Sequence, residues 1–328
     1  MIVVTGAAGF IGSNIVADLE ARDQGPIAVV DWFTLDERWR NLAGRQIDAF
    51  VRPENMGEWL ATHTEEVKAI IHMGAISATT ERDVDKLVEN NINFTVKLWD
   101  WCTEHRVPFI YASSAATYGG IESGFIDDQS LEAMSALQPL NAYGWSKKAT
   151  DLIFARRIAE GKPSPPQWAG LKFFNVYGPN EYHKDDMMSV ACKLYDQVVR
   201  GERLRLFKSY RDCIGDGEQS RDFVYVKDCT AFIMWLLDNP SKSGIFNVGS
   251  GQARSFLDVA RALGRAMNRN VDIEFIEMPE TIRDRYQYFT QADMTKARDE
   301  GMLTPFHSLE DGIGDYVATY LSHNNRYR

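Results

Sequence analysis

The sequence begins with MIVVTGAAGFIG, residues 1–12, and this stretch predicts the fold. Its apolar run Ile2–Val4 is short and β-branched, as expected of a buried strand. Gly6, Gly9 and Gly12 follow at a GxxGxxG spacing, and apolar residues beyond them recur at helical intervals. A strand, a glycine turn and a helix are typical of a dinucleotide site, because glycine lets a pyrophosphate approach the N–H groups that begin the helix.

An acidic residue closes the next predicted strand. The apolar run 27–30 ends in Asp31, and a carboxylate about 20 residues beyond a glycine turn binds the ribose hydroxyls of a dinucleotide. This pattern favours NAD, whose 2′-hydroxyl is free. Trp32 and Arg38 follow in a loop expected along the adenosine end, where Arg38 would either neutralise the 2′-phosphate of NADP or lie in solvent. A tight βα turn that binds nothing is the remaining alternative.

Composition excludes several classes of protein. The chain has 328 residues, enough for two domains or one large α/β domain with a smaller lobe. A net charge of -10 argues against a nucleic-acid surface. No apolar run approaches the ~18 residues of a membrane helix, and the first residues predict a strand rather than a targeting signal. The four cysteines have no paired spacing, so we expect a cytoplasmic protein with reduced thiols and no metal site.

A further apolar strand is predicted at 69–72, and the small-residue stretch 73–77 follows it. Small residues at the carboxyl end of a parallel strand suit the crevice in which such a sheet binds its ligand. We expect His72 to be a packed, hydrogen-bonded residue rather than a catalyst. We also expect Asn90 to open a helix through Trp101 and to reach back to the crevice.

The chemical centre is predicted from a strand at 109–112 and the helix after it. The strand ends in Ser113 and Ser114, whose hydroxyls would face the cofactor, and Tyr143 and Lys147 share one face of the helix at i, i+4. A nearby ammonium and a positive nicotinamide favour a phenolate, although a shift of the phenol pKa from near 10 to about 7 needs roughly 4 kcal/mol. Tyr143 would then accept a hydroxyl proton, with Ser114 bonded to the same oxygen. The alternative is a surface pair on the helix.

Three stretches resemble the extended short-chain dehydrogenase/reductase superfamily: TGAAGFIG (5–12), YASSAATYGG (111–120) and YGWSK (143–147). The resemblance covers essentially the whole chain. It is closer still to the epimerases that invert C6″ of an ADP-linked heptose. The stretches that carry this second resemblance are FNVYGP (174–179), EYHK (181–184), MMSV (187–190), SRDFVYV (220–226) and RYQYFTQAD (285–293).

The resemblance implies an α/β fold: a Rossmann-type doubly wound parallel sheet with a smaller α/β substrate-binding lobe. Residues 1–174 and about 222–248 would form the dinucleotide-binding domain, and residues 175–221 and 249–328 the substrate lobe. The implied reaction converts ADP-D-glycero-D-manno-heptose to the L-glycero form through transient oxidation by bound NADP, or else NAD, in lipopolysaccharide core heptose precursor synthesis. It also implies a homo-oligomer, a pentamer in the family, and a nucleotide-sugar substrate.

The resemblance assigns roles to individual residues. Lys184 would be the second acid/base, opposite Tyr143, and Lys147 and Ser114 would complete the catalytic set. The implied cofactor contacts are Gly6, Gly9, Phe10, Ile11, Gly12, Asp31, Trp32, Arg38, Met73, Gly74, Ala75, Ile76, Ser77, Asn90, Lys147, Val176 and Lys184. The implied substrate contacts are Ser114, Asn175, Asp186, Lys193, Phe207, Lys208, Ser209, Tyr210, Arg221 and Tyr286.

Two departures from the family pattern concern the substrate. Asp185-Asp186 stands where the family usually has Gly-Ser, and the loop 210–219 is longer than the family's. A 4-epimerase or 4,6-dehydratase of another nucleotide sugar is the alternative enzyme, although Ala115–Thr117 offers no carboxylate for a dehydratase. A dinucleotide-binding module without turnover is a further alternative, although such proteins typically lose the tyrosine–lysine pair.

Overall fold

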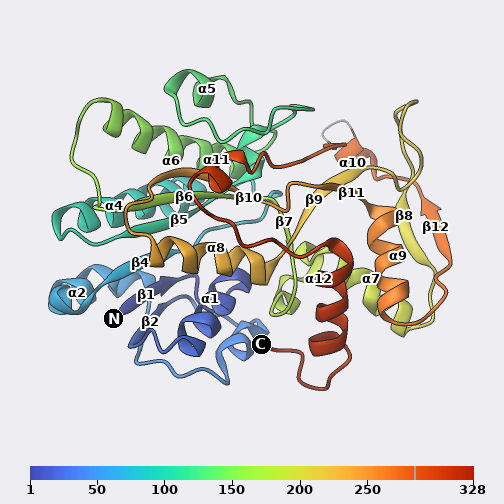
Figure 1. Cartoon of the computed structure of the whole chain (residues 1–328), viewed down its shortest axis with the longest axis horizontal. Helices are drawn as coiled ribbons and strands as arrows, with labels where there is room; N and C mark the ends of the chain where they lie inside the picture. Colours follow the sequence, from blue (N-terminus) through green and yellow to red (C-terminus); the bar gives the residue numbers. More distant parts are fainter. Residues whose placement is uncertain (284–285) are drawn as a thin grey trace.

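The computed structural model describes residues 1–283 and 286–328. Its central element is a seven-stranded parallel sheet in the order β10-β6-β5-β4-β1-β2-β3 (Figure 1). Both faces of the sheet are covered, which is why its strands are near-continuous apolar runs such as IVVT. The strands of this sheet are β1 (Ile2–Thr5), β2 (Ile27–Val30), β3 (Ala49–Val51), β4 (Ala69–His72), β5 (Phe109–Ser114), β6 (Trp168–Phe173) and β10 (Gly244–Val248).

Helices cover both faces of this sheet (Figure 1). Apolar residues of α1 (Phe10–Ala21) and α8 (Val226–Asp238) pack in one core. Those of α2 (Met56–Thr62), α4 (Phe94–Glu104) and α6 (Ala142–Ala159) pack in another. This arrangement confirms the predicted doubly wound Rossmann-type fold. The carboxyl ends of β1, β4 and β5 all meet at one edge, because the strands run in the same direction.

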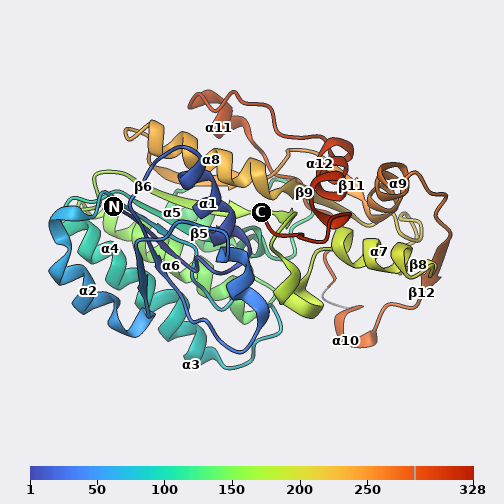
Figure 2. The same ribbon diagram turned by 90° about the horizontal axis from the view of Figure 1, so that it is seen from below.

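A smaller lobe lies at one end of the large sheet, as Figure 2 shows. Its core is formed by three helices packed on short strands. One small sheet has the order β11-β9-β7, and the other pairs β12 with β8. The elements of this lobe are β7 (Asn175–Tyr177), α7 (Val190–Val199), β8 (Leu204–Phe207), β9 (Ser220–Tyr225), β11 (Ala253–Ser255), α9 (Phe256–Ala266), β12 (Ile273–Ile276) and α12 (Leu309–Asp315).

The expected domain boundaries need two corrections. The chain returns to the large sheet with α8, not at 222, because β9 pairs with β7 and β11 in the small lobe. The region 249–328 is also not confined to the small lobe. Ala292, Met294, Ala297 and Met302 pack in the core beneath the large sheet. Two lobes are present, but the chain crosses between them more often than the sequence pattern indicates.

The remaining helical segments are short. They are η1 (Glu37–Leu42), η2 (Pro53–Asn55), η3 (Thr64–Glu66), α3 (Val84–Leu87), η4 (Val88–Asn93), η5 (Ala115–Tyr118), α5 (Leu131–Ala136), η6 (Tyr182–Met187), α10 (Glu280–Arg283), α11 (Thr295–Asp299) and η7 (Tyr316–Leu321). In the part of the chain that the structure describes, no helix is long and apolar enough to cross a membrane.

Candidate active site

The glycine turn packs too tightly for side chains at two of its three glycines. Gly6 has φ +63°, and a Cβ there would lie 2.6 Å from the backbone nitrogen of Gly74. A Cβ on Gly12 would lie 2.1 Å from the carbonyl oxygen of Gly6. Gly9 precedes α1, whose first turn has neither a side-chain cap nor an acidic residue. The first N–H groups of α1 therefore have no side-chain partner, and this arrangement suits a pyrophosphate.

Asp31 lies directly against this turn. Its carboxylate accepts hydrogen bonds from the backbone nitrogens of Ala8 and Trp32, each at 2.8 Å. Burial raises the pKa of Asp31, and the hydrogen bond from Ala8 and the charge of Arg38 oppose this rise. The Arg38 guanidinium binds the Asp36 carboxylate and reaches to 3.6 Å from Asp31. Asp31 and Arg38, the two residues that bear on the choice between NAD and NADP, therefore lie side by side.

The stretch 73–77 crosses the end of β1, as predicted for a segment at the crevice. The backbone nitrogen of Met73 donates to the carbonyl of Thr5 at 3.1 Å, and that of Gly74 donates to the Thr5 hydroxyl at 3.1 Å. His72 is buried between the hydroxyls of Thr5 and Thr95, and burial lowers its pKa to about 3. It is therefore the packed, hydrogen-bonded residue that the sequence predicts.

Asn91, not Asn90, reaches back to the crevice. Its side chain exchanges two hydrogen bonds with the backbone of Ile76 and donates to the Ser146 hydroxyl at 3.0 Å. The side chain of Asn90 donates to the carbonyl of Lys86 on its own helical segment. The expected helix start at Asn90 is wrong, because this segment already begins at Val84, whereas the contact of Asn90 with a cofactor stays a prediction.

Tyr143 and Lys147 lie one turn apart near the start of α6, as predicted. Lys147 is 3% exposed, and its ammonium donates to the carbonyl of Ala112 at 2.8 Å. Burial lowers the pKa of Lys147 to about 8, while the charge of Asp151 opposes this shift. Ser114, at the end of β5, lies within hydrogen-bonding reach of the Tyr143 phenol. The three residues predicted to act together are therefore assembled at one end of the sheet.

The pKa of Tyr143 differs from the sequence expectation. Burial raises it, and the nearby charge of Asp151 adds to the rise, whereas a hydrogen bond from Ser114 lowers it. Burial disfavours the charged phenolate when no cationic ligand lies beside it. The residues around Tyr143 therefore do not produce the predicted depression of this pKa, because burial and the charge of Asp151 outweigh the hydrogen bond from Ser114.

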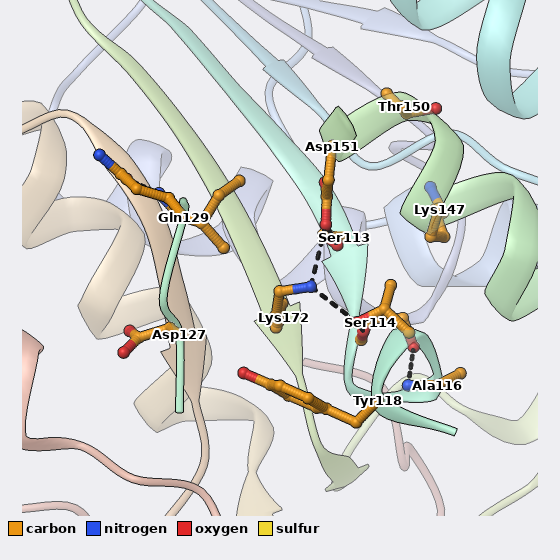
Figure 3. Close-up of polar contacts among 12 residues, drawn as sticks. Ser113, Ser114, Ala116, Tyr118, Asp127, Gln129, Lys147, Thr150, Asp151 and Lys172 are labelled. Atoms are coloured by element: carbon orange, nitrogen blue, oxygen red, sulfur yellow. Dashed lines mark hydrogen bonds and ion pairs between the residues drawn. The ribbon is translucent and has the colours of Figure 1, made fainter. Parts of the chain in front are cut away.

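Ser113 does not face the crevice, contrary to expectation. Its hydroxyl donates to the Asp151 carboxylate on α6 at 2.6 Å, and Ser113 is only 2% exposed. Ser113 is therefore bonded within the protein, and Ser114 is the serine that lies beside the Tyr143 phenol. Behind them lies a buried polar cluster around Asp151 and Lys172 (Figure 3), which the sequence does not predict.

Lys184 lies beside the glycine turn, although it is distant from it in sequence. Its ammonium is 5.4 Å from the centre of the Phe10 ring, which begins α1. Burial lowers the pKa of Lys184, and the charge of Glu181 opposes this shift. The Asn14 amide donates to the carbonyl of Pro179 at 2.9 Å, so the segment before Lys184 is fixed on α1. Ile11 and Val176 pack against the cores of both lobes.

Asp185 has a backbone conformation that favours glycine. Its φ is 45° and its ψ is -117°, within η6. This is the position where the family usually carries glycine, and a side chain is strained there. Asp186 follows with an exposed side chain, and its carbonyl accepts from the Lys193 ammonium at 2.6 Å. The first departure seen in the sequence therefore coincides with a strained turn beside Lys184.

The Asp185→Gly variant is expected to raise the free energy of unfolding by about 1 kcal/mol, because it removes the strain at a positive φ. Denaturant-induced unfolding followed by circular dichroism measures this change. Asp186→Gly is the matched control and should lower stability, because Asp186 is outside the positive-φ region. Equal effects of the two substitutions would contradict the strain at Asp185.

The predicted nucleotide-binding residues gather in the small lobe. The Arg221 guanidinium lies 5.0 Å from the centre of the Tyr286 ring and is 7% exposed. The ring of Phe207 meets that of Tyr286 edge-on at 6.3 Å. The backbone nitrogen of Tyr210 donates to the Tyr288 hydroxyl at 3.0 Å. Burial lowers the pKa of Arg221, yet its charge remains available to a diphosphate.

Other predicted substrate residues have contacts of their own. The Lys208 ammonium is paired with Glu277 at 2.7 Å. The backbone nitrogen of Ser209 donates to Asp216 at 2.7 Å, which orders part of the loop that appears longer than the family's. Asn175 is exposed at the start of β7. These contacts place the residues but do not establish roles for them, so their assignment to the substrate stays a prediction.

Sequence reasoning missed two arginines near this lobe's aromatic residues. The Arg283 guanidinium lies 3.8 Å from the centre of the Tyr210 ring, and that of Arg211 lies 4.3 Å from Tyr288. The Gln287 amide donates to the carbonyl of Gly119, which joins this region to the turn after Ser114. The basic residues around the motif 285–293 were the sequence signal that could have predicted these contacts. Arg285, the first residue of that motif, lies outside the described residues.

A family model decides the classification. It is the NAD dependent epimerase/dehydratase family, and it matches residues 2–249. The chain belongs to this family. Nicotinamide dinucleotide is the family's cofactor, and the open start of α1 with Asp31 beside it fits such a group. Membership of this family accounts for the glycine turn, the tyrosine–lysine pair and the parallel sheet together.

Relatives within the family are similar over their full lengths. The chain is 45% identical to ADP-L-glycero-D-manno-heptose-6-epimerase of Fusobacterium nucleatum, with 100% of both chains covered. It is 48% identical to the Nitratidesulfovibrio vulgaris enzyme of the same name, over 98% of each chain. The crystal structure of the Helicobacter pylori enzyme of that name matches with a TM-score of 0.80 and 26% identity, over 97% of this chain and 95% of the other.

Proposed function

We propose that this chain is an epimerase that inverts C6″ of ADP-D-glycero-D-manno-heptose to give the L-glycero form, in the synthesis of heptose precursors of the lipopolysaccharide core. The observation that carries the proposal is the placement of two acid/base candidates from separate elements around one dinucleotide turn. Tyr143 lies with Lys147 and Ser114 at the end of β5, and Lys184 lies against Phe10. The full-length relatives support the same substrate.

Two acid/base groups are what an inversion at a carbinol carbon needs. When bound, the nicotinamide ring supplies reversible hydride exchange with C6″. One of Tyr143 and Lys184 removes the proton of the C6″ hydroxyl, and the other returns a proton after the ketone has turned over in the pocket. Burial lowers the pKa of Lys184, and the charge of Glu181 opposes this shift, so burial brings the pKa of this amine closer to the range in which acid/base groups work. Ser114 would donate a hydrogen bond to the C6″ oxygen, the same oxygen with which Tyr143 exchanges a proton.

The rest of the substrate would extend into the small lobe. Arg221 and Arg283 would meet the diphosphate, since guanidinium groups bind phosphate oxygens through two parallel N–H donors. Tyr286 and Phe207 would form an apolar wall beside them. The Gln287–Gly119 contact supports one continuous site, because it ties this wall to the turn that follows Ser114.

A direct assay tests this function. Purified protein is incubated with ADP-D-glycero-D-manno-heptose, and proton NMR follows the configuration at C6″. Inversion with no net change in cofactor absorbance is expected. A parallel screen of UDP- and ADP-hexoses separates the alternatives, since inversion at C4 of a hexose without activity on the heptose would identify a 4-epimerase instead. A protein that carries cofactor and inverts neither class would contradict the proposal.

We propose NADP as the cofactor, with NAD as the alternative. Both Asp31 oxygens already accept backbone hydrogen bonds, and the Arg38 guanidinium lies beside them, where a 2′-phosphate would stand. Arg38→Ala is expected to weaken NADP binding by about tenfold or more, through loss of a charge-assisted contact, and to leave NAD binding within about threefold. Calorimetric titration of cofactor-free protein measures both constants.

Arg40→Ala is the matched control for Arg38, because Arg40 is two residues away, exposed and paired with Glu37. It should leave both affinities unchanged. Equal losses of NAD and NADP affinity in Arg38→Ala would contradict a contact with the 2′-phosphate. The mass of the cofactor that copurifies gives an independent answer.

We also propose that the chain forms a homo-oligomer, a pentamer by family resemblance. Large apolar side chains are exposed on the segment from 33 to 50, among them Leu35 and Phe50. The Phe33 and Phe50 rings lie 5.8 Å apart, and exposed apolar side chains that gather in this way are typical of interaction surfaces. Light scattering coupled to size exclusion is expected to give five times the mass of the chain. A monomer would contradict this proposal without bearing on catalysis.

A further inference from the structure

A fully buried ion pair lies directly behind the candidate active site. The Lys172 ammonium on β6 is 3.0 Å from the Asp151 carboxylate on α6, and the two side chains are 2% and 1% exposed. Removing two charges from water costs free energy, and replacing such a pair by apolar residues is often neutral or stabilising. A contribution to stability therefore does not explain why the pair is present, and its hydrogen-bond partners indicate another role.

Asp151 binds the end of β5, and Lys172 binds the η5 turn that follows it. Asp151 accepts from the Ser113 hydroxyl at 2.6 Å and from the Tyr111 hydroxyl at 3.0 Å. Lys172 donates to the Thr117 hydroxyl at 2.6 Å, and Thr117 in turn donates to the carbonyl of Ser114 at 2.8 Å. Figure 3 shows Lys172 between the α6 carboxylate and the turn that follows Ser114. Contacts on both sides of Ser114 thus converge on one ion pair.

The same pair belongs to the helix of the catalytic residues. Tyr143, Lys147 and Asp151 are spaced four residues apart, so they share one face of α6. Lys147 adds a contact from that face to the carbonyl of Ala112, also on β5. Helix α6 and the end of β5 are therefore joined by polar contacts along the line that leads to the Tyr143–Ser114 contact.

We propose that Asp151 and Lys172 are positioning residues: their ion pair locks the end of β5 to α6 and so holds the Ser114 hydroxyl against the Tyr143 phenol. The inference rests on the proposed function, in which Ser114 and Tyr143 act on the same substrate oxygen. Ser114 on β5 lies within hydrogen-bonding reach of the Tyr143 phenol, and the charge of Asp151 acts on both Tyr143 and Lys147. The charge of Lys147 in turn lowers the pKa of His72 on β4.

The principal test is a double-mutant cycle with Ser114. The variant Asp151→Asn/Lys172→Met removes both charges together, because either change alone leaves one buried charge without a partner. We expect kcat to fall by about tenfold or more and KM to stay within about threefold. In a Ser114→Ala background the same two changes should lower kcat by no more than about twofold, since the group they position is already gone.

A control ion pair joins the large sheet's helix α8 to the small lobe. Lys227 and Asp315 are 2.6 Å apart and join α8 to α12. Lys227→Met/Asp315→Asn should leave kcat unchanged in both backgrounds. A loss of kcat by Asp151→Asn/Lys172→Met that is equal with and without Ser114 would overturn the proposal, and so would parental kcat in the folded variant.

A second measurement needs neither substrate nor turnover. Thr117→Val removes the hydroxyl between Lys172 and Ser114 and leaves both charges in place. Ultraviolet titration of the Tyr143 phenol, taken as the difference from the matching Tyr143→Phe protein, should move upward by about half or more of the shift that Ser114→Ala causes. An unmoved titration would overturn the proposal, whatever sugar the protein is found to act on.

Discussion

Under the proposed function, the Tyr143→Phe protein is expected to turn over ADP-heptose about 10³-fold more slowly than the parent, because it lacks the phenol to which we assign exchange of the C6″ hydroxyl proton. The substitution removes one oxygen and keeps the ring, so α6 and its packing should persist. Lys147 keeps its contact with the carbonyl of Ala112. We therefore expect an unchanged melting temperature and unchanged cofactor binding, with the loss confined to kcat.

Tyr195→Phe is the matched control for this substitution. The Tyr195 hydroxyl donates to the carbonyl of Leu321 in the small lobe, away from the glycine turn. Its loss should leave kcat within about twofold of the parent and cost only the stability of one hydrogen bond. Turnover by Tyr143→Phe at more than a tenth of the parental rate would rule out proton transfer by this phenol.

The Lys184→Met variant is expected to lower kcat by about 10²-fold or more in both directions of the reaction, because each direction needs one group to remove a proton and a second to return it. Methionine keeps the apolar length of the side chain, so packing against Phe10 should be retained. Rates measured from the D-glycero and from the L-glycero substrate check the symmetry of the loss. Cofactor content, measured after denaturation, shows whether binding is affected as well.

Lys148→Met is the control for a lysine without a chemical role. Its ammonium donates to the carbonyls of Ser135 and Leu137 beside α6. Parental turnover is expected for this variant. If Lys184→Met loses less than about tenfold in kcat, the two-base scheme is wrong, and Tyr143 would have to serve both faces of the sugar.

The parts of the fold that sequence predicts are those with a local pattern. The strand–glycine–helix start, the strand 69–72 and the placement of Tyr143 and Lys147 on one helix depend on residues close together in the chain, and all three are confirmed. The helix expected to open at Asn90 begins earlier, because Asp83 caps the helical segment and accepts from the backbone nitrogen of Lys86. An acidic cap before an apolar residue was a signal that could have been used.

Long-range pairing accounts for most of what the sequence could not predict. Lys172 stands in an apolar strand and Asp151 on a polar helix, and only the packing of α6 against the sheet brings them together. The strained φ of Asp185 is likewise invisible in a sequence that offers aspartate where glycine is usual. Arg283 joins the nucleotide end because its chain folds back onto Tyr210. Each of these depends on tertiary contacts that no local spacing records.

Helix α1 has a second role beyond the start of the dinucleotide turn. Its Ser13 and Asn14 hold Asn180 and Pro179, which precede Lys184, so one helix anchors both the turn and the segment that carries a reacting amine. Whatever ligand steadies the first turn of this helix also steadies that segment. If an occupied turn increases the affinity for the proposed sugar nucleotide, thermodynamic reciprocity requires the sugar nucleotide to increase the affinity for the dinucleotide by the same factor. An enzyme built in this way would exchange one sugar after another while its coenzyme stays in place.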